Sequence, residues 1–454
     1  MRQSPKENDG RLLAPWERNF DRILTPFEEF VHRETTSGLF LMAAALVALL
    51  WANSPLASYY QSLLHTPLGF SLGPWELRKT LHHWVNDGLM TLFFFVVGLE
   101  LKREILVGEL AQPRHAALPI LAAIGGMAVP ALLYFTLVSG GDALRGWGIP
   151  MATDIAFALG VIALLAHRVP KNLITFLVAL AIVDDLGAVV VIALFYTEQL
   201  SWPLLLAAGA LTGLLVAMNL AGVRRAPAYF TIGFLLWLAL LKSGVHATLA
   251  GVITAFTIPA LPRYEPRAFS RRMRELLDRF DASHRPGESI LQNQDLTAIV
   301  QTLAKGVGGV QTPLRRLEDD MHLPVAFLVL PLFALFNAGV PIEFGELGTA
   351  LMQPVTLAVG TGLVVGKFIG IAGVAWLAVR SGRVDLPTGV SMAQIAGAAL
   401  LGGIGFTMSI FIAELAFAHQ PERILEAKLG ILSASLLAGI SGSAWLYRTG
   451  NKGA

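Results

Sequence analysis

Two adjacent aspartates, Asp184 and Asp185, stand in the middle of the apolar run LVALAIVDDLGAVVVIAL. Neighbouring carboxylates cannot both be ionised and unpaired in hydrocarbon, so they require a proton, a cation or a basic partner. Because successive helix residues point about 100° apart, one can face a water-filled cavity and the other a neighbouring helix. Carboxylate oxygens for which protons and a hard cation compete are the minimum machinery of ion exchange. The alternative is a hydrogen-bonded pair that only locks helices together.

Three more ionisable residues interrupt apolar stretches, where such residues are costly and usually functional. Asp87 lies in WVNDGLM, Asp154 in PMATDIAFALG and Lys367 in GLVVGKFIGIAG. Lys367 needs a partner at that depth, and the aspartates are the available ones; the alternative is a lysine that extends to the membrane interface. His246, in KSGVHATLAGVI, is a weaker signal and more typical of a structural histidine near the end of a span.

A charged group follows the segment that carries Asp87. Glu100, Arg103 and Glu104 have the spacing of one helix face. Two interpretations remain open at this point, a solvated helix end and a regulatory charge cluster.

The elements that must position these residues are apolar helices. Of the 454 residues 54% are hydrophobic and only 15% are charged, against about 25% charged in soluble proteins. The mean hydropathy is +0.61. A spanning helix needs about 20 mainly apolar residues. About 12 segments qualify on that criterion, and they are 37–56, 83–105, 117–138, 144–166, 172–197, 203–219, 226–241, 245–260, 323–341, 354–380, 387–416 and 424–447. The sequence therefore predicts an all-α polytopic membrane protein.

The distribution of lysine and arginine along the chain predicts its domain boundaries and its orientation in the membrane. Most lysines and arginines fall in the polar arm 1–36, in every second connection and in the tail 448–454. By the positive-inside rule both termini are cytoplasmic, and so is the long polar loop 261–322 within the transmembrane domain 37–447. In that loop RRMRELLDRF predicts an amphipathic helix, and turn signals in 66–80 predict an external hairpin. The net charge of +2 gives no basic surface for nucleic acid, and the absence of cysteine excludes thiolate metal sites.

Two predicted spans are interrupted at matching places. The first carries Asp154 between Pro150 and Gly160, and the second carries the glycines of LLGGIGFTMSIF. Each is the middle helix of a triple, 117–197 or 354–447, and the intervening helix count gives the two triples opposite orientations. This pattern is typical of inverted repeats, in which half-helices meet at mid-membrane and form the ion site.

Several strings in this order together resemble the NhaA family of sodium/proton antiporters, one of the folds on which the inverted-repeat rule rests. They are WVNDGLMTLFFFVVGLELKRE, ATDIAFALG, LAIVDDLGAVVVIALFYT, KSGVHATLAGVI, LPLFALFNAGV, VGKFIGI and GIGFTMSIFIAELAF, and they extend from about residue 83 to 416. The resemblance implies an NhaA-like fold of twelve helices with two broken, crossing helices. It also implies an electrogenic, pH-regulated secondary transporter, not an enzyme, that exchanges cytoplasmic Na⁺ or Li⁺ for external H⁺ without a cofactor.

The resemblance assigns roles to residues. It implies that Asp184 and Asp185 bind Na⁺ and protons, with Asp185 the more exposed ligand and Asp184 the partner of Lys367. It also implies that Thr153 supplies an auxiliary oxygen ligand, and that Asp154 and Lys367 balance the dipoles of the half-helices. Asp87 is a structural charge. The positions that match the family's pH response are Glu100, Arg103, Glu104, His246 and Glu318.

The family resemblance also implies a homodimer in the bacterial inner membrane, in contact with lipid and with a hairpin like 66–80 at the dimer contact. Two features depart from the compact members of the family. The loop 261–322 is longer, and RRLEDDMHLP places Asp319 and Asp320 where those members are more basic.

Two other functions fit parts of this pattern. An intramembrane aspartyl protease also needs two buried aspartates on different helices, and Asp154 with Asp185 would qualify, but it needs neither an adjacent pair nor Lys367. A sodium-coupled solute symporter of the same fold is expected to add polar or aromatic groups to the crossing helices, and few are present.

Overall fold

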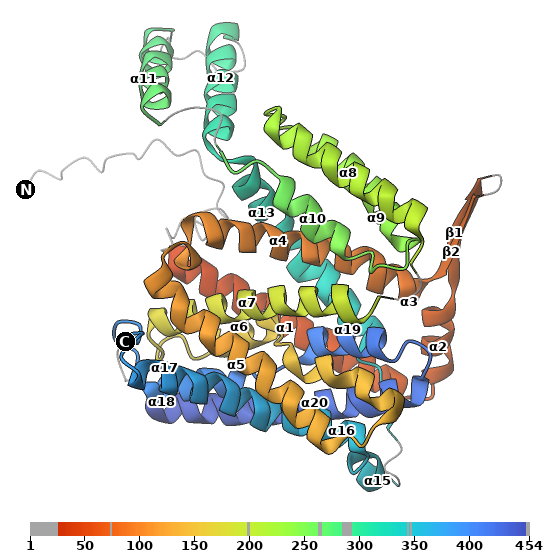
Figure 1. Cartoon of the computed structure of the whole chain (residues 1–454). Helices are drawn as coiled ribbons and strands as arrows, with labels where there is room; N and C mark the ends of the chain where they lie inside the picture. The colour runs from red at the N-terminus through yellow and green to blue at the C-terminus, as the bar shows by residue number, and fades with distance from the viewer. Residues whose placement is uncertain are drawn as a thin grey trace, which may run out of the picture.

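The computed structural model describes residues 26–72, 75–197, 200–261, 266–283, 293–342, 345 and 347–450. Within these ranges the chain is mainly helical and contains one two-stranded antiparallel hairpin (Figure 1). Most of the predicted arm 1–36 and the last four residues of the predicted tail lie outside the described residues.

The first half of the chain holds the hairpin and the first of the two broken helices. Its elements are α1 (Pro26–Ala52), α2 (Ala57–His65), β1 (Pro67–Leu72), β2 (Trp75–Thr80), α3 (Leu81–His83), the π-helical η2 (Trp84–Leu89), α4 (Met90–Val107), the 3₁₀ turn η3 (Glu109–Ala111), α5 (Pro113–Leu137), the 3₁₀ helix η4 (Gly141–Met151), α6 (Ile155–Ala163), α7 (Lys171–Phe195), α8 (Trp202–Leu220), α9 (Ala226–Leu241) and α10 (Leu249–Thr257).

The second half holds the long polar loop and the second broken helix. Its elements are α11 (Pro266–Ser283), α12 (Gln294–Val310), α13 (Pro313–Pro324), the π-helical η5 (Val325–Val329), α14 (Leu330–Asn337), α15 (Leu347–Leu351), α16 (Pro354–Thr361), the π-helical η6 (Gly362–Gly366) and η7 (Ile369–Gly373), α17 (Val374–Arg380), α18 (Met392–Leu401), α19 (Phe406–Ala416) and α20 (Pro421–Thr449).

Apolar helices long enough to cross a membrane dominate the described residues. Eight qualify by length and composition, and the bent pair α18–α19 makes a ninth. The predicted polytopic helical fold is thereby confirmed, and the remaining three predicted spans correspond to η2–α4, α9 and α10. Large apolar side chains on the outer helices, such as Leu206, Leu220 and Leu194, are exposed, as expected of surfaces that contact lipid.

Two predicted spans differ from the observed helices. The segment 245–260 is helical only over α10, because Gly244 has a left-handed φ of 88° and the chain up to Thr248 forms turns. The segment 323–341 belongs to a helix that already begins at Pro313, where the Thr312 hydroxyl accepts a hydrogen bond from the Arg315 amide. The polar residues at the start of α13 made this helix resemble a loop in the sequence.

The two polar excursions agree with the sequence. Residues 67–72 and 75–80 pair antiparallel from Pro67↔Thr80 to Leu72↔Trp75, as predicted for the hairpin. Within the long loop RRMRELLDRF is part of α11, which packs against α12. Both excursions project from the helical body in Figure 1.

The spanning helices form two groups. In the first group, α4 packs against α10 and α13, α8 and α9 pack together, and α14 contacts η2. In the second group, α5 packs against α7, η4 and η7, while α20 packs against α16, α18 and α19. Helix α1 contacts both groups through α14 and α6. Figure 1 shows the first group above and the second below.

Each triple of the second group contains one broken helix, as predicted. The first break is the non-helical stretch 152–154 between η4 and α6, and the second is the stretch 402–405 between α18 and α19, which are bent by 48°. Gly160 does not contribute to the first break, contrary to the sequence prediction. It lies inside α6, where α1 approaches so closely that a Cβ on Gly38 would meet its Cα at 2.7 Å.

Lys367 lies between two π-helical turns, η6 and η7, on a helix that packs tightly on α5. Wide turns of this kind often occur at functional sites. The close approach depends on glycine, because a Cβ on Gly370 would collide with the carbonyl oxygen of Gly125.

We therefore expect Gly370→Ala to lower the melting temperature, since overpacking of this kind costs about 1–3 kcal/mol. It is also expected to displace Lys367, because the helix that carries this residue must shift away from α5. Gly373→Ala is the matched control, since the nearest atom to a Cβ there lies at 3.9 Å. Equal melting temperatures for the two variants would contradict the prediction.

Candidate functional site

The two broken helices cross at their non-helical segments. The Asp154 amide donates to the Ile404 carbonyl at 2.6 Å, and the Thr153 hydroxyl donates to the Gly402 carbonyl at 2.8 Å. The broken segments thus satisfy each other's backbone groups, as buried non-helical backbone must within a membrane.

Asp154 lies at the point where two helices begin. One oxygen, Oδ1, accepts the Phe157 amide of α6 at 2.9 Å. The other, Oδ2, accepts both the amide and the hydroxyl of Thr407 in the first turn of α19, at 2.9 and 2.5 Å. One buried carboxylate therefore caps both helix N-termini and counters the partial positive charge of both dipoles.

Asp184 and Lys367 form a buried ion pair. The Lys367 Nζ lies 2.7 Å from Asp184 Oδ2, and the lysine side chain is fully buried. The same oxygen accepts the Thr153 amide at 2.8 Å. This places α7, the first break and the π-helical segment around Lys367 in direct contact, and it is the pairing that the family resemblance implies.

Asp185 has a different environment, although it is equally buried at 1% exposure. Among the described residues neither of its carboxylate oxygens has a hydrogen-bond partner, and neither does Oδ1 of Asp184. Buried polar atoms are nearly always paired, and each exception requires an explanation. Three such oxygens on two adjacent residues are suited to a proton or to a hard cation.

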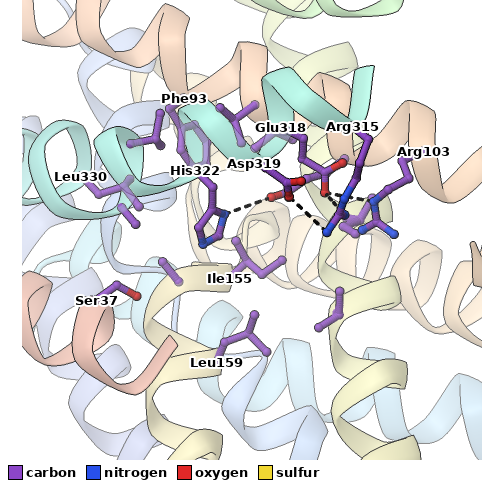
Figure 2. Close-up of a pocket in the computed structure, with 18 residues that line it drawn as sticks. Ser37, Phe93, Arg103, Ile155, Leu159, Arg315, Glu318, Asp319, His322 and Leu330 are labelled. Carbon is purple, nitrogen blue, oxygen red and sulfur yellow. Dashed lines mark hydrogen bonds and ion pairs between the residues drawn. The ribbon is translucent and has the colours of Figure 1, made fainter. Parts of the chain in front are cut away.

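A cavity of about 510 Å³ lies beside α7 next to this site, and Figure 2 shows residues that line it. Its walls come from α1, α4, α6, α7, α13, η5 and α14, which belong to both helix groups. Val178 and Ile182 line it from α7. Asp185 continues their spacing by one turn, so it lies on the same face of α7 just beyond the lined part of the cavity.

Charged side chains gather at the mouth of this cavity, as Figure 2 shows. Arg103 lies 2.7 Å from Glu104 and 3.0 Å from Glu318. Arg315 binds Glu318 and Asp319, both at 3.1 Å. His322 Nδ1 lies 3.8 Å from Glu100. Four of the five predicted pH-response residues, Glu100, Arg103, Glu104 and Glu318, therefore come together from α4 and α13.

The fifth residue, His246, lies elsewhere. Its Nε2 is 3.0 Å from the Tyr196 carbonyl oxygen, and it lines a small cavity of about 70 Å³ near the opposite end of the molecule. Asp87 is at the same end, in the π-helical η2, where His246, His83 and Lys79 are the nearby basic residues. The cluster at the mouth of the large cavity thus contains neither residue.

Some residues near the site were not identified from the sequence. Thr407 follows the glycines of GIGFTMSIF and holds Asp154; a polar residue directly after a helix break was the available signal. Glu414 and Lys428 lie inside predicted spans and form an ion pair of 2.6 Å.

Among the described residues no group of three or more acidic, histidine or cysteine side chains is arranged to hold a resident metal ion.

The sequence profile of the family described as Na⁺/H⁺ antiporter 1 matches residues 28–446. This chain belongs to that family. It is 60% identical over 453 residues to "Na(+)/H(+) antiporter NhaA 1" of Saccharophagus degradans, and the aligned region covers 99% of this chain and 98% of the relative. It is also 52% identical over 436 residues to the NhaA antiporter of Sulfurimonas denitrificans, with 96% and 98% covered. The similarity to NhaA antiporters therefore includes both broken helices and both helix groups.

Proposed function

We propose that this chain is a secondary transporter that exchanges cytoplasmic Na⁺ or Li⁺ for external H⁺, with Asp185 and Asp184 as the ligands for both. The observation that carries the proposal is a set of three buried carboxylate oxygens, at the crossing of two broken helices, that have no hydrogen-bond partner in the described part of the chain. Such oxygens favour a proton or a cation, and occupancy by one excludes the other. Family membership supports the same exchange.

Three neighbouring residues support the competition between a proton and a cation for these oxygens. The Thr153 amide donates to Asp184, and its hydroxyl donates its proton to the Gly402 carbonyl, so the lone pairs of the hydroxyl oxygen can serve as an auxiliary ligand. Lys367 compensates the charge of Asp184, and Asp154 fixes the two half-helices. No resident cofactor enters this proposal; Na⁺, Li⁺ and H⁺ are the transported ions.

The proposed orientation places both termini and the loop 261–322 in the cytoplasm of a bacterial inner membrane, because most lysines and arginines lie on that side. The cavity mouth, formed by α4 and α13 next to this loop, then faces the cytoplasm. The proposed domains are the arm 1–36, the transmembrane domain 37–447 and the tail 448–454. We also propose a homodimer in lipid, with the hairpin of β1 and β2 at the dimer contact.

The mouth cluster is proposed to respond to pH. Glu318 binds Arg315 within α13 and Arg103 of α4, so protonation of Glu318 would weaken the ion pair that joins the two helices. His246, at the other end, would act separately from this cluster. Asp319 shares Arg315 with Glu318, which adds an acidic group to the cluster.

The two rival functions are disfavoured by specific contacts. In an aspartyl protease Asp154 would have to activate water with Asp185, but both oxygens of Asp154 accept backbone hydrogen bonds. A solute symporter requires polar groups near the ion site, whereas the inner part of the cavity is lined by apolar residues such as Ile155, Leu159 and Ile182.

The deciding experiment is proton flux in vesicles that contain only the purified protein. Addition of NaCl or LiCl is expected to release protons from the acid-loaded interior, while KCl is not. Absence of any sodium-dependent proton movement over a broad pH range would contradict the proposed function.

Transport is further expected to be electrogenic. If sodium displaces one proton from Asp185 and another from the Asp184–Lys367 pair, each cycle moves net charge; the coupled groups share these protons. A membrane potential is worth about 2.3 kcal/mol per charge per 100 mV. Collapsing the potential with valinomycin and potassium should therefore change the rate. A rate that is insensitive to the potential, with no voltage signal after a sodium jump, would indicate one-for-one exchange.

A further inference from the structure

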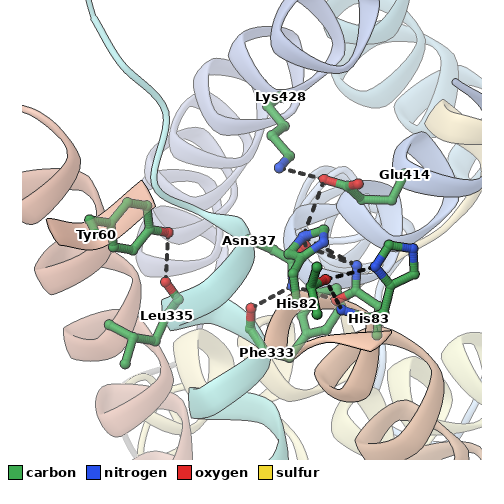
Figure 3. Close-up of polar contacts among 10 residues, drawn as sticks. Tyr60, His82, His83, Phe333, Leu335, Asn337, Glu414 and Lys428 are labelled. Atoms are coloured by element: carbon green, nitrogen blue, oxygen red, sulfur yellow. Dashed lines mark hydrogen bonds and ion pairs between the residues drawn. The ribbon is translucent and has the colours of Figure 1, made fainter. Parts of the chain in front are cut away.

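A second buried polar cluster lies near η2, at the other end of α4 from the charged residues of the large cavity, and Figure 3 shows its contacts. Lys428 Nζ is 2.6 Å from Glu414 Oε1, and His82 Nε2 is 3.8 Å from the same oxygen. His82 also contacts Asn337 Oδ1 at 3.0 Å, and Asn337 in turn donates to Asn86 at 2.8 Å. The Glu414 and Lys428 side chains are only 14% and 12% exposed.

This cluster joins the two helix groups. His82, Asn86 and Asn337 belong to α3, η2 and α14, whereas Glu414 and Lys428 belong to α19 and α20. At the cavity end the corresponding faces of the two groups are separated, because the cavity lies between them. The His82–Glu414 contact thus lies between the two helix groups at one end of the molecule, whereas the cavity separates the same groups at the other end.

An aromatic layer lies between this cluster and the ion site. Phe411 of α19 packs against Phe333 of α14 and Phe94 of α4, with ring centroids 6.2 and 5.5 Å apart, and all three are buried. Thr407, Phe411 and Glu414 have the spacing of one face of α19. Glu414 is therefore about 10 Å along the helix from Thr407, which holds Asp154 at the crossing.

We propose that the aromatic layer and the contact of His82 with the Glu414–Lys428 pair form the outer gate of the transporter. This inference rests on the proposed function, since an exchanger must open the ion site to one side at a time. In this structure the cavity at the cytoplasmic end is open and the gate is closed. Exposure of the site to the outside requires that α19 and α20 separate from α3 and α14.

The chain contains no cysteine, so two introduced cysteines can carry spin labels without other changes. Tyr59 on α2 is 69% exposed and is followed by Tyr60, whose hydroxyl donates to the Leu335 carbonyl of α14. Glu422 is exposed at the start of α20. Labels at Tyr59→Cys and Glu422→Cys thus report the separation of the two groups at the outer end, measured by pulsed electron resonance in lipid nanodiscs.

With native Glu414 we expect one narrow, short distance in the absence of sodium. Glu414→Gln removes a buried charge partner and should raise the ratio of long to short distances roughly tenfold. Glu414→Asp keeps the carboxylate that faces His82 and should retain the short distance, which a fold disrupted at this point would not do. Glu426→Gln, also on α20 but without an ion pair among the described residues, is the matched control and should behave as the parent.

An unchanged distance distribution in Glu414→Gln, with sodium-dependent proton flux retained, would overturn the gate and leave the proposed function intact. Loss of flux in the unmodified protein would instead refute the proposed function. If Glu414→Gln is not recovered in folded form, His82→Leu, which removes the contact between the two groups, serves as the second variant, and a short distance in that variant also overturns the gate.

Discussion

Replacing Asp185 by asparagine is expected to abolish sodium-dependent proton exchange while the protein inserts and folds. The substitution removes the charge from two buried oxygens that have no partner among the described residues. An amide neither binds nor releases a proton in the working range and is a weaker ligand for a hard cation. The rate of proton release after a sodium jump, measured in vesicles, should fall to that of protein-free vesicles.

Stability provides an independent readout for this variant. Because the Asp185 carboxylate has no compensating partner, its neutral replacement should leave the melting temperature equal or higher. Asp142→Asn, an exposed position at the start of η4, controls for the loss of one acidic residue and should transport normally. Persistent exchange by Asp185→Asn, or a fall in its melting temperature, would refute the assignment.

Lys367→Ala is expected to cause the largest loss of stability. It leaves Asp184 buried without its cation, and breaking a buried ion pair by removing one partner costs about 3–5 kcal/mol. The measurement is the melting temperature in detergent, together with the denaturant midpoint. Lys367→Met, which keeps most of the side-chain volume, separates the lost charge from the cavity that alanine creates.

The double variant Asp184→Asn with Lys367→Met tests the pairing itself. Removing both charges should recover most of the lost stability, because no buried charge remains uncompensated. A double-mutant cycle then gives the coupling between the two residues. The ion pair does not stabilise the fold if Lys367→Met has the melting temperature of the parent protein. The same conclusion follows if the stability loss of the double variant equals the sum of the losses of the two single variants.

Much of this architecture follows from sequence because membranes restrict the choices. Backbone in hydrocarbon must be helical, so apolar length alone locates most spans. An ionisable residue inside a span is energetically costly and is usually kept for a function, which is why Asp184, Asp185 and Lys367 could be identified from the sequence. The two glycine- and proline-containing breaks were likewise visible, although Gly160 proved to be a packing glycine instead of a helix breaker.

Contacts between segments that are distant in the chain could not be predicted from the sequence. The hydrogen bond of Thr407 to Asp154 joins residues 253 positions apart, and only the crossing of the two breaks brings them together. Glu414 and Lys428 lie near span ends, where charged residues commonly contact solvent, so their burial and pairing could not be inferred. The length of α10 depends on the positive φ of Gly244, which a lone glycine does not specify.

The crossing of the broken helices has a consequence for the direction of transport. Its segments are tied to each other and to α7 by the bonds of Asp154, Thr153 and Asp184. An ion bound there as proposed would have its ligands on segments that these bonds tie together, and we expect those segments to move as one unit against the other helices. The ligands, and hence the intrinsic affinity for the ion, are then the same whichever compartment the site faces. Such a carrier has no built-in direction, and the gradients of sodium, protons and voltage alone decide which way each ion goes.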